Sequence, residues 1–368
     1  MNNPGRFWRN FDWILAGAVL ALIAIGVLVI WSTSFKATAL ASSSDTIKQI
    51  GSAIFGLIVM LVVARTDYRL WGRLAPYFYV ATTLLLVAVL FSHSVLGAQR
   101  WIPLGPIQLQ PSELAKLALI ISLARFLSRQ YDRLNSWRYL GVSLFYLAVP
   151  MALVLRQPDL GTALVLGFTW LMMVLVSRIS KKQLGALAAV ALAATPFLLS
   201  HLKDYQKARL TIFLNPQSDP LGAGHNVIQS TITIGSGQLF GRGLAAGSQS
   251  QLNFLPQLAQ HTDFIFAVLG EKMGFVGGAL LILLFAVVIW RGIMTAYRSV
   301  DRFGFFVATG IVAMFFFHIF INIGMNMALA PVTGIPLPFV SYGGTAIVVN
   351  LVAIGLLQSI TTRRHKVG

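Results

Sequence analysis

Long apolar stretches, each bounded by charged or turn-forming residues, recur along the whole chain. About 20 consecutive apolar residues are enough for a helix to cross a bilayer, so the pattern predicts a helix over each stretch. These helices fall at 12–34, 47–64, 75–96, 112–128, 139–155, 161–178, 184–201, 263–290, 303–325 and 341–360. We therefore expect an all-α, polytopic membrane protein with about ten transmembrane helices in a single domain, 1–368.

The basic residues are distributed unevenly between the two sides of this predicted bundle. Most of the 28 Lys and Arg residues lie at the termini and in the loops that follow even-numbered spans. Cytoplasmic loops carry the excess of Lys and Arg, so we expect both termini to be cytoplasmic. The segment 202–262, between the seventh and eighth spans, is then a long extracytoplasmic loop. Its Gly and Pro residues favour turns and re-entrant or interfacial pieces.

The composition agrees with a membrane protein and narrows the chemistry. Hydrophobic residues make up 57% of the chain and charged residues 11%, whereas a soluble domain has about 45–50% and about 25%. A net charge of +17 would suggest nucleic acid if the basic residues formed one patch. Here they separate apolar runs, so we expect no nucleic-acid partner. The chain has no Cys, which excludes disulfides, thiolate catalysis and Cys-ligated metals.

Charged residues inside or at the mouth of membrane spans are costly and mark function by default. Glu113 and Lys116 are three residues apart and share a helix face; a structural ion pair explains them as well as a functional one does. Glu113, Asp159 and Asp263 each open a helix that starts at the outer face. For Asp159 we favour a helix cap. Asp263 follows His261 at the end of the long loop, where the head of a membrane-anchored substrate would lie.

Further polar side chains are expected at the same outer face. The cations are Arg100, Arg156, Arg209 and Arg242, and the hydrogen-bonding residues of the last two helices are Asn322, Asn326, Ser341 and Tyr342. Arg side chains and the N–H groups of helix starts suit a pyrophosphate. Contact with solvent or lipid head groups explains Arg209 and Arg242 equally well, and the hydrogen-bonding residues more often join helices together.

Two other patterns carry little weight. The glycine-rich run 235–243 looks like a phosphate-binding loop, but it follows no predicted strand and has neither Rossmann nor Walker spacing. The histidines show no ligand spacing in the sequence, and the chain has no Gly-x-Ser-x-Gly elbow. A His-based metal site and a hydrolase are therefore not expected.

Several motifs, in order and over nearly the whole chain, resemble those of the SEDS family of bacterial cell-wall proteins. They are Gly-Ala-Gln-Arg-Trp (97–101), Gln-Pro-Ser-Glu-Leu-Ala-Lys (110–116), Gln-Pro-Asp-Leu-Gly-Thr (157–162), Ser-Asp-Pro-Leu-Gly-Ala-Gly (218–224), Gly-Ser-Gln-Ser-Gln-Leu (247–252), His-Thr-Asp-Phe-Ile-Phe-Ala-Val (261–268), Asn-Ile-Gly-Met (322–325) and Pro-Leu-Pro-Phe-Val-Ser-Tyr-Gly-Gly (336–344). The Gln-Ser-Gln-Leu segment favours the RodA branch over the FtsW branch. The chain departs from the family at Leu255-Pro256-Gln257, where Leu-Pro-Glu is usual, and at Glu271-Lys272, where two glutamates are common.

The resemblance implies a peptidoglycan glycosyltransferase in the bacterial cytoplasmic (inner) membrane, with its active site on the extracytoplasmic face. Such an enzyme polymerises lipid II beside a class B penicillin-binding protein that supplies transpeptidation, within a complex of other elongation membrane proteins. By the same resemblance, Asp263 is the general base for the acceptor hydroxyl while lipid pyrophosphate leaves.

The remaining candidate site residues would hold the substrate. The cations proposed for the pyrophosphate are Arg100, Lys116, Arg209 and Arg242, and Glu113, His261 and Ser341 complete the set. We expect Glu113 to orient Lys116. The alternative to these cationic side chains is a divalent cation, Mg²⁺ or Mn²⁺, at the leaving pyrophosphate; Glu113 would then help to hold the metal instead of orienting Lys116, and the sequence does not identify the metal.

Two other classes of function stay open on the sequence. One is a lipid II flippase or transporter, for which ten spans and intramembrane charges are typical, and the other is a non-catalytic scaffold for the elongation machinery. A transporter needs polar groups along the whole crossing path, whereas those found here gather at the outer ends of the spans. This distribution favours the polymerase.

Overall fold

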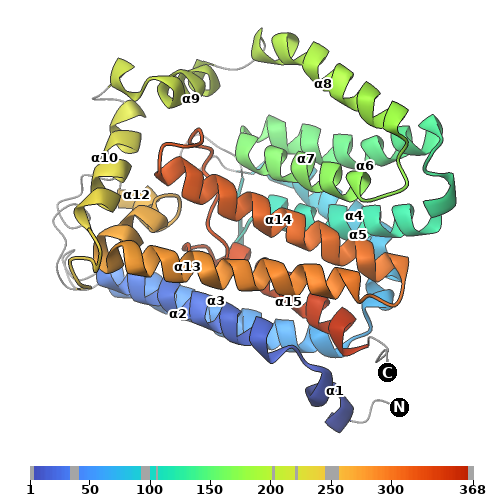
Figure 1. The fold of residues 1–368 in the computed structure, drawn as a ribbon, viewed down its shortest axis with the longest axis horizontal. Coiled ribbons are helices and arrows are strands. Elements are labelled where there is room, and N and C mark those ends of the chain that lie inside the picture. Colours follow the sequence, from blue (N-terminus) through green and yellow to red (C-terminus); the bar gives the residue numbers. More distant parts are fainter. Residues whose placement is uncertain are drawn as a thin grey trace.

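All ten predicted spans are α-helices in the computed structural model, which describes residues 4–33, 41–92, 100–104, 107–200, 204–219, 223–244 and 257–363. After the short α1 (Pro4–Asn10) they are α2 (Trp13–Thr33), α3 (Ala41–Arg65), α4 (Tyr68–Val89), α5 (Pro111–Arg129), α6 (Trp137–Arg156), α7 (Leu160–Leu175), α8 (Lys181–Ser200), α13 (Ile265–Tyr297), α14 (Arg302–Asn326) and α15 (Gly344–Thr362). Most of them run side by side in one bundle (Figure 1). The predicted all-α, polytopic membrane fold is confirmed.

Not every helix of the bundle is an uninterrupted apolar span. Among the described residues, seven helices are long and apolar enough to cross a membrane, namely α2, α3, α4, α6, α13, α14 and α15. Helix α7 is apolar but has 16 residues, and α5 carries charged residues within its apolar sequence. The boundary errors are largest for α4 and α13. Helix α13 extends to Tyr297, past its predicted end at 290. Helix α4, predicted over 75–96, begins at Tyr68, because Asp67 caps it there by accepting a hydrogen bond from Arg69 N at 2.9 Å.

The segment predicted as a long loop contains short helices. They are α9 (Asp204–Leu214), the 3-10 helix η2 (Pro216–Ser218), α10 (Ala223–Ser236) and α12 (Gln257–Gln260). Helices α10 and α12 lie at the end of the bundle opposite the chain termini (Figure 1). Motif residues 97–99, 220–222 and 247–252, and Leu255 and Pro256, lie outside the described residues.

A two-stranded antiparallel hairpin, which the sequence did not predict, precedes α5. It pairs β1 (Ile102–Leu104) with β2 (Ile107–Leu109), and Ile102 lies opposite Leu109. Thr345, at the start of α15, donates its hydroxyl to Gln108 O at 2.6 Å. The hairpin is therefore fixed to the last helix of the bundle.

The glycine-rich run 235–243 packs against a kink in α13. At Gly274 the backbone leaves the helical region (φ 63°, ψ −161°), so α13 is two helical segments that meet there. Its backbone just after the kink donates hydrogen bonds to Gln238 O (2.8 Å) and Leu239 O (3.1 Å). A Cβ at Gly241, where φ is 80°, would clash with the α13 backbone. The glycines thus permit close backbone packing, in agreement with the low weight given to a phosphate-binding loop.

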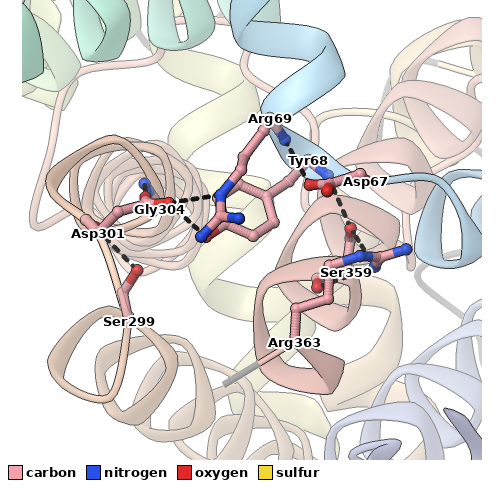
Figure 2. A network of polar contacts seen from close by, with 8 residues as sticks. All are labelled: Asp67, Tyr68, Arg69, Ser299, Asp301, Gly304, Ser359 and Arg363. Atoms are coloured by element: carbon pink, nitrogen blue, oxygen red, sulfur yellow. Dashed lines mark hydrogen bonds and ion pairs between the residues drawn. The ribbon is translucent and has the colours of Figure 1, made fainter. Parts of the chain in front are cut away.

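Hydrogen bonds to Asp301, in the turn between α13 and α14, hold the end of the bundle where both termini lie (Figures 1 and 2). Its carboxylate accepts from Tyr68 Oη (2.7 Å), Arg69 Nε (2.9 Å) and Gly304 N (2.7 Å). Burial alone would raise the pKa of Asp301, and these hydrogen bonds outweigh it and lower that pKa. Ser359 Oγ of α15 accepts from Tyr68 N at 3.1 Å. Both termini lie at the same end of the bundle, as an even number of spans requires. That this end faces the cytoplasm stays a prediction.

Residues 330–343, here called the inner loop, form most of the connection between α14 and α15; they have no regular secondary structure, yet none of their side chains is exposed. Leu337, Phe339 and Val340 are 1%, 2% and 0% exposed. Helix α2 packs directly on this loop at Gly26, where the two backbones touch. The inner loop is therefore part of the core of the bundle.

Gly26→Ala should destabilise the protein. A Cβ at Gly26 would lie 2.6 Å from Val340 O and 2.7 Å from Val340 Cα, and overpacking a tight contact costs about 1–3 kcal/mol. We expect a lower melting temperature for the purified protein in detergent. Gly17→Ala in the same helix is the matched control, because a Cβ there meets nothing within 4 Å. Equal stability of the two variants would contradict the packing described.

Candidate active site

Asp263 lies in the turn between α12 and α13, and hydrogen bonds fix its backbone. Its N–H donates to Ala259 O at 3.0 Å, and its carbonyl accepts from the side-chain amides of Asn322 (3.1 Å) and Asn326 (2.9 Å) on α14. The N-cap position of α13 is Phe264 rather than Asp263, and no described side chain caps this helix. The carboxylate of Asp263 is therefore not a helix cap, whereas that of Asp159 was predicted to be one.

The other side of this turn is held by the inner loop and by α2. Ser341 Oγ donates to Thr262 O at 2.6 Å, and Tyr342 N donates to His261 O at 2.8 Å. The His261 ring lies 3.2 Å from Thr33 Oγ1, and burial lowers the pKa of this histidine. The structure thus brings His261 and Ser341, both candidate site residues, next to Asp263 as parts of its support.

The surroundings of the Asp263 side chain make it a stronger base than an ordinary aspartate. Burial raises the pKa of Asp263 to about 6, and the positive charges of Arg209 and Arg100 limit the rise, while Asp159 adds to it. A carboxyl group with this pKa is ionised at neutral pH and well matched to accept a proton. The structure therefore brings Arg100 and Arg209 close enough to act on Asp263.

Arg100 is anchored to the turn between α6 and α7. Its Nε donates to Gln157 O at 3.0 Å, and its guanidinium also binds Pro158 O. In the same turn Asp159 caps α7, accepting from Thr162 N (3.1 Å) and Thr162 Oγ1 (2.9 Å). The prediction of a cap for Asp159 is confirmed, and the cap places a second carboxylate near Asp263.

Arg209 lines a cavity of about 160 Å³ between α9, α10 and the inner loop. The lining residues are Arg209, Ile212, Phe213, Asn226, Val227, Ala330 and Val332. One cation and one amide among apolar walls suit a ligand that joins an anionic group to a hydrocarbon. Arg242 lies elsewhere: its N–H donates to Glu271 O at 2.9 Å beside the kink of α13, and its Nε donates to Ser236 O at 3.0 Å.

Glu113 and Lys116 form the ion pair that their spacing predicts. Lys116 Nζ lies 2.8 Å from Glu113 Oε1, with the two side chains 2% and 3% exposed. The same Nζ lies 3.0 Å from Nε2 of His318 on α14. Sequence spacing could not reveal His318, because the contact joins helices that are about 200 positions apart in the chain. The only signal for His318 in the sequence was its position as a polar residue within an apolar helix.

The described residues form no cluster of three or more His, Asp or Glu side chains that could hold a metal. The ammonium group of Lys116 lies between Glu113 and His318, so Glu113 does not fit the metal-ligand role considered for it. Mg²⁺ is often held by one or two carboxylates together with substrate phosphates. A divalent cation at this end of the bundle stays an expectation.

Comparison with known proteins gives the family. The family of cell cycle proteins that comprises FtsW, RodA and SpoVE matches residues 12–366. This chain belongs to the FtsW/RodA/SpoVE family. The membership inferred from the motifs is thereby confirmed.

Members of the FtsW/RodA/SpoVE family match over almost their full length. The peptidoglycan glycosyltransferase MrdB of Escherichia coli K12 is 41% identical, covering 99% of this chain and 98% of MrdB. Stage V sporulation protein E of Bacillus subtilis is 37% identical (95% and 96%). The peptidoglycan glycosyltransferase RodA of Treponema pallidum is 34% identical (96% and 98%).

Solved structures show the same fold for this member of the FtsW/RodA/SpoVE family. A chain from a peptidoglycan synthase complex, described as coordinating polymerization and crosslinking, has a TM-score of 0.82 at 30% identity, covering 97% of this chain and 99% of that one. RodA of Thermus thermophilus has a TM-score of 0.71 at 28% identity, with 97% and 98% covered. The similarity extends over the whole bundle.

Lys116→Met should be strongly destabilising, since it leaves the charge of Glu113 buried without its partner. Breaking a buried pair in this way costs about 3–5 kcal/mol. The double variant Glu113→Gln/Lys116→Met removes both charges, so we expect it to regain most of the lost stability. The measurement is the melting temperature in detergent. A single variant as stable as the double variant would contradict the pairing.

Proposed function

We propose that the chain is a peptidoglycan glycosyltransferase that polymerises lipid II during cell elongation, with Asp263 as the general base. The observation that carries this assignment is a half-buried carboxylate on a fixed backbone, with a pKa of about 6, acted on by Arg209 and Arg100. The names of MrdB and RodA support the class of reaction.

The residues around Asp263 suit this chemistry step by step. A hydroxyl of the acceptor sugar attacks the anomeric carbon of the donor sugar, and its proton passes to the Asp263 carboxylate. The new C–O bond forms as the bond from the anomeric carbon to the lipid pyrophosphate breaks, so the electron pair leaves with the pyrophosphate. General base catalysis contributes about 10²–10⁴-fold. Arg209 and Arg100 would stabilise the charge on the leaving group.

The cavity at Arg209 supports the same assignment. Its cation suits a phosphate group, and walls such as Ile212 and Phe213 suit the first units of a lipid chain. We assign this cavity to the part of the substrate where the pyrophosphate joins the lipid chain. His261 and Arg242 stay candidates for contacts with the rest of the substrate.

The protein is a multi-pass membrane protein, and we place Asp263 on the extracytoplasmic face of the bacterial cytoplasmic membrane. The basic residues around Asp301, at the opposite end, suit the cytoplasmic side. We further propose a class B penicillin-binding protein as partner, together with other membrane proteins of the elongation machinery. The likeness to a chain from a peptidoglycan synthase complex supports a transpeptidase partner.

Asp263→Asn should abolish polymerisation of purified lipid II. Loss of the base predicts a rate at least about 10²-fold lower, measured as glycan strands formed by the protein with its partner. Asp132→Asn is the control, because Asp132 is an exposed aspartate that pairs with Arg178 and Arg302. Full polymerisation by a folded Asp263→Asn protein would refute the proposal; loss of lipid II translocation in liposomes instead would favour the flippase.

The rate should depend on pH through Asp263. Because the base must be ionised, we expect kcat/KM to fall as the pH drops below about 6, the pKa of the carboxyl group. The charge of Arg209 lowers this pKa, so Arg209→Gln should move the acid limb to higher pH. Arg242→Gln should leave the limb in place. If kcat/KM falls at the same pH in Arg209→Gln as in the wild type, the assignment of Asp263 as the group that titrates is contradicted.

A further inference from the structure

Three buried side chains on one face of α14 bind backbone carbonyls of irregular segments. His318, Asn322 and Asn326 follow one another at intervals of four residues and are 3%, 0% and 0% exposed. Asn322 Nδ2 donates to Ile335 O at 2.8 Å as well as to Asp263 O. His318 Nδ1 lies 3.1 Å from Pro336 O. This face of α14 therefore holds both the inner loop and the turn that carries Asp263.

The ion pair on α5 fixes the protonation of His318. An ammonium group has only hydrogen-bond donors, so Nε2 of His318, 3.0 Å from Lys116 Nζ, has to be the acceptor. The ring proton of the neutral imidazole is then on Nδ1, which donates it to Pro336 O. Glu113 holds Lys116 in place through Oε1. We call Glu113, Lys116 and His318 the buried trio.

The backbone that the buried trio holds lies against the catalytic carboxylate. Gly334 has a φ of 73°, and a Cβ placed on it would lie 3.6 Å from Asp263 Oδ2. The next two carbonyls of the inner loop, Ile335 O and Pro336 O, are the ones bound by Asn322 and His318. Any shift of these carbonyls therefore moves the wall beside the carboxylate.

We propose that the buried trio is a positioning device for Asp263, acting through residues 334–336 of the inner loop. The inference rests on the function proposed for Asp263. It gives Lys116 a task other than binding pyrophosphate: its side chain is 2% exposed, and its ammonium group is engaged by Glu113 and His318. The trio thus acts on the transition state through the base and makes no contact with substrate.

Variants of His318 test the proposal in the lipid II polymerisation assay. His318→Phe fills the space without hydrogen bonds, and His318→Ser keeps a hydroxyl but is too short to reach Pro336. We expect both to lower kcat by about 10- to 100-fold with KM for lipid II unchanged, because misplacement of a catalytic group by about 1 Å costs up to about 10²-fold. His318→Gln keeps an accepting group, its carbonyl oxygen, and a donating group, its NH2, in place of the two ring nitrogens of neutral imidazole, and should keep most of the activity.

A double-variant cycle separates positioning from binding of pyrophosphate. Glu113→Gln/Lys116→Met removes the ion pair without leaving a lone charge, and it should lower kcat as His318→Phe does. Combining the two changes should bring little further loss, because both break the same chain of contacts. Additive losses, or a loss confined to KM, would show that Lys116 binds substrate and would overturn the proposal.

Two further outcomes decide between the two proposals. Wild-type kcat in both His318→Phe and His318→Ser would overturn the positioning role while leaving Asp263 as the base. Full activity of Asp263→Asn in the same assay would overturn the function proposed for Asp263, and the positioning role with it. Melting temperatures of all variants identify any that fail to fold. If His318→Phe does not fold, His318→Ser, which introduces a smaller side chain, still tests the positioning role.

Discussion

A membrane protein that places irregular backbone inside a helical bundle has to satisfy the polar groups of that backbone from within the protein, because lipid offers no hydrogen bonds. For the inner loop, His318 and Asn322 of α14 bind two of these groups, Pro336 O and Ile335 O. Asn322, together with Asn326 on the same face of α14, also fixes the turn that carries Asp263. One solution to a structural requirement therefore also sets the geometry of the candidate active site.

Charge divides the molecule into two ends with different physical tasks. At the end where the termini lie, exposed and half-buried ion pairs such as Arg69–Asp301 tie the helices together. At the other end, the positive charges of Arg209 and Arg100 act on the half-buried carboxylate of Asp263. Between the two ends, Lys116 is buried with Glu113 and His318, and such a charge is stable only when its hydrogen bonds are satisfied. The net charge of +17 is thus mostly a matter of topology.

Particular elements show how far the sequence could predict the structure. The lengths of the apolar stretches predicted each of the ten helices, and the spacing of Glu113 and Lys116 predicted that the two side chains form an ion pair. The start of α4 was wrong because its first turns are too polar for an apolar window, and a capping aspartate decides where it begins. The hairpin before α5 was missed because two strands of three residues carry no readable period. The glycine-rich run was correctly set aside, but its contact with the kink at Gly274 needed the fold.

The sequence by itself determined the membrane class, the helices, the family and the position of Asp263 at a helix start, because all of these depend on local composition and order. Only the tertiary structure decided which partners surround that carboxylate. Arg209, Arg100, Gly334 and Asn322 come from four separate segments, and His318 reaches Lys116 from another helix. Burial and long-range contacts set the basicity and the orientation of a side chain, and neither can be read from its neighbours in the chain.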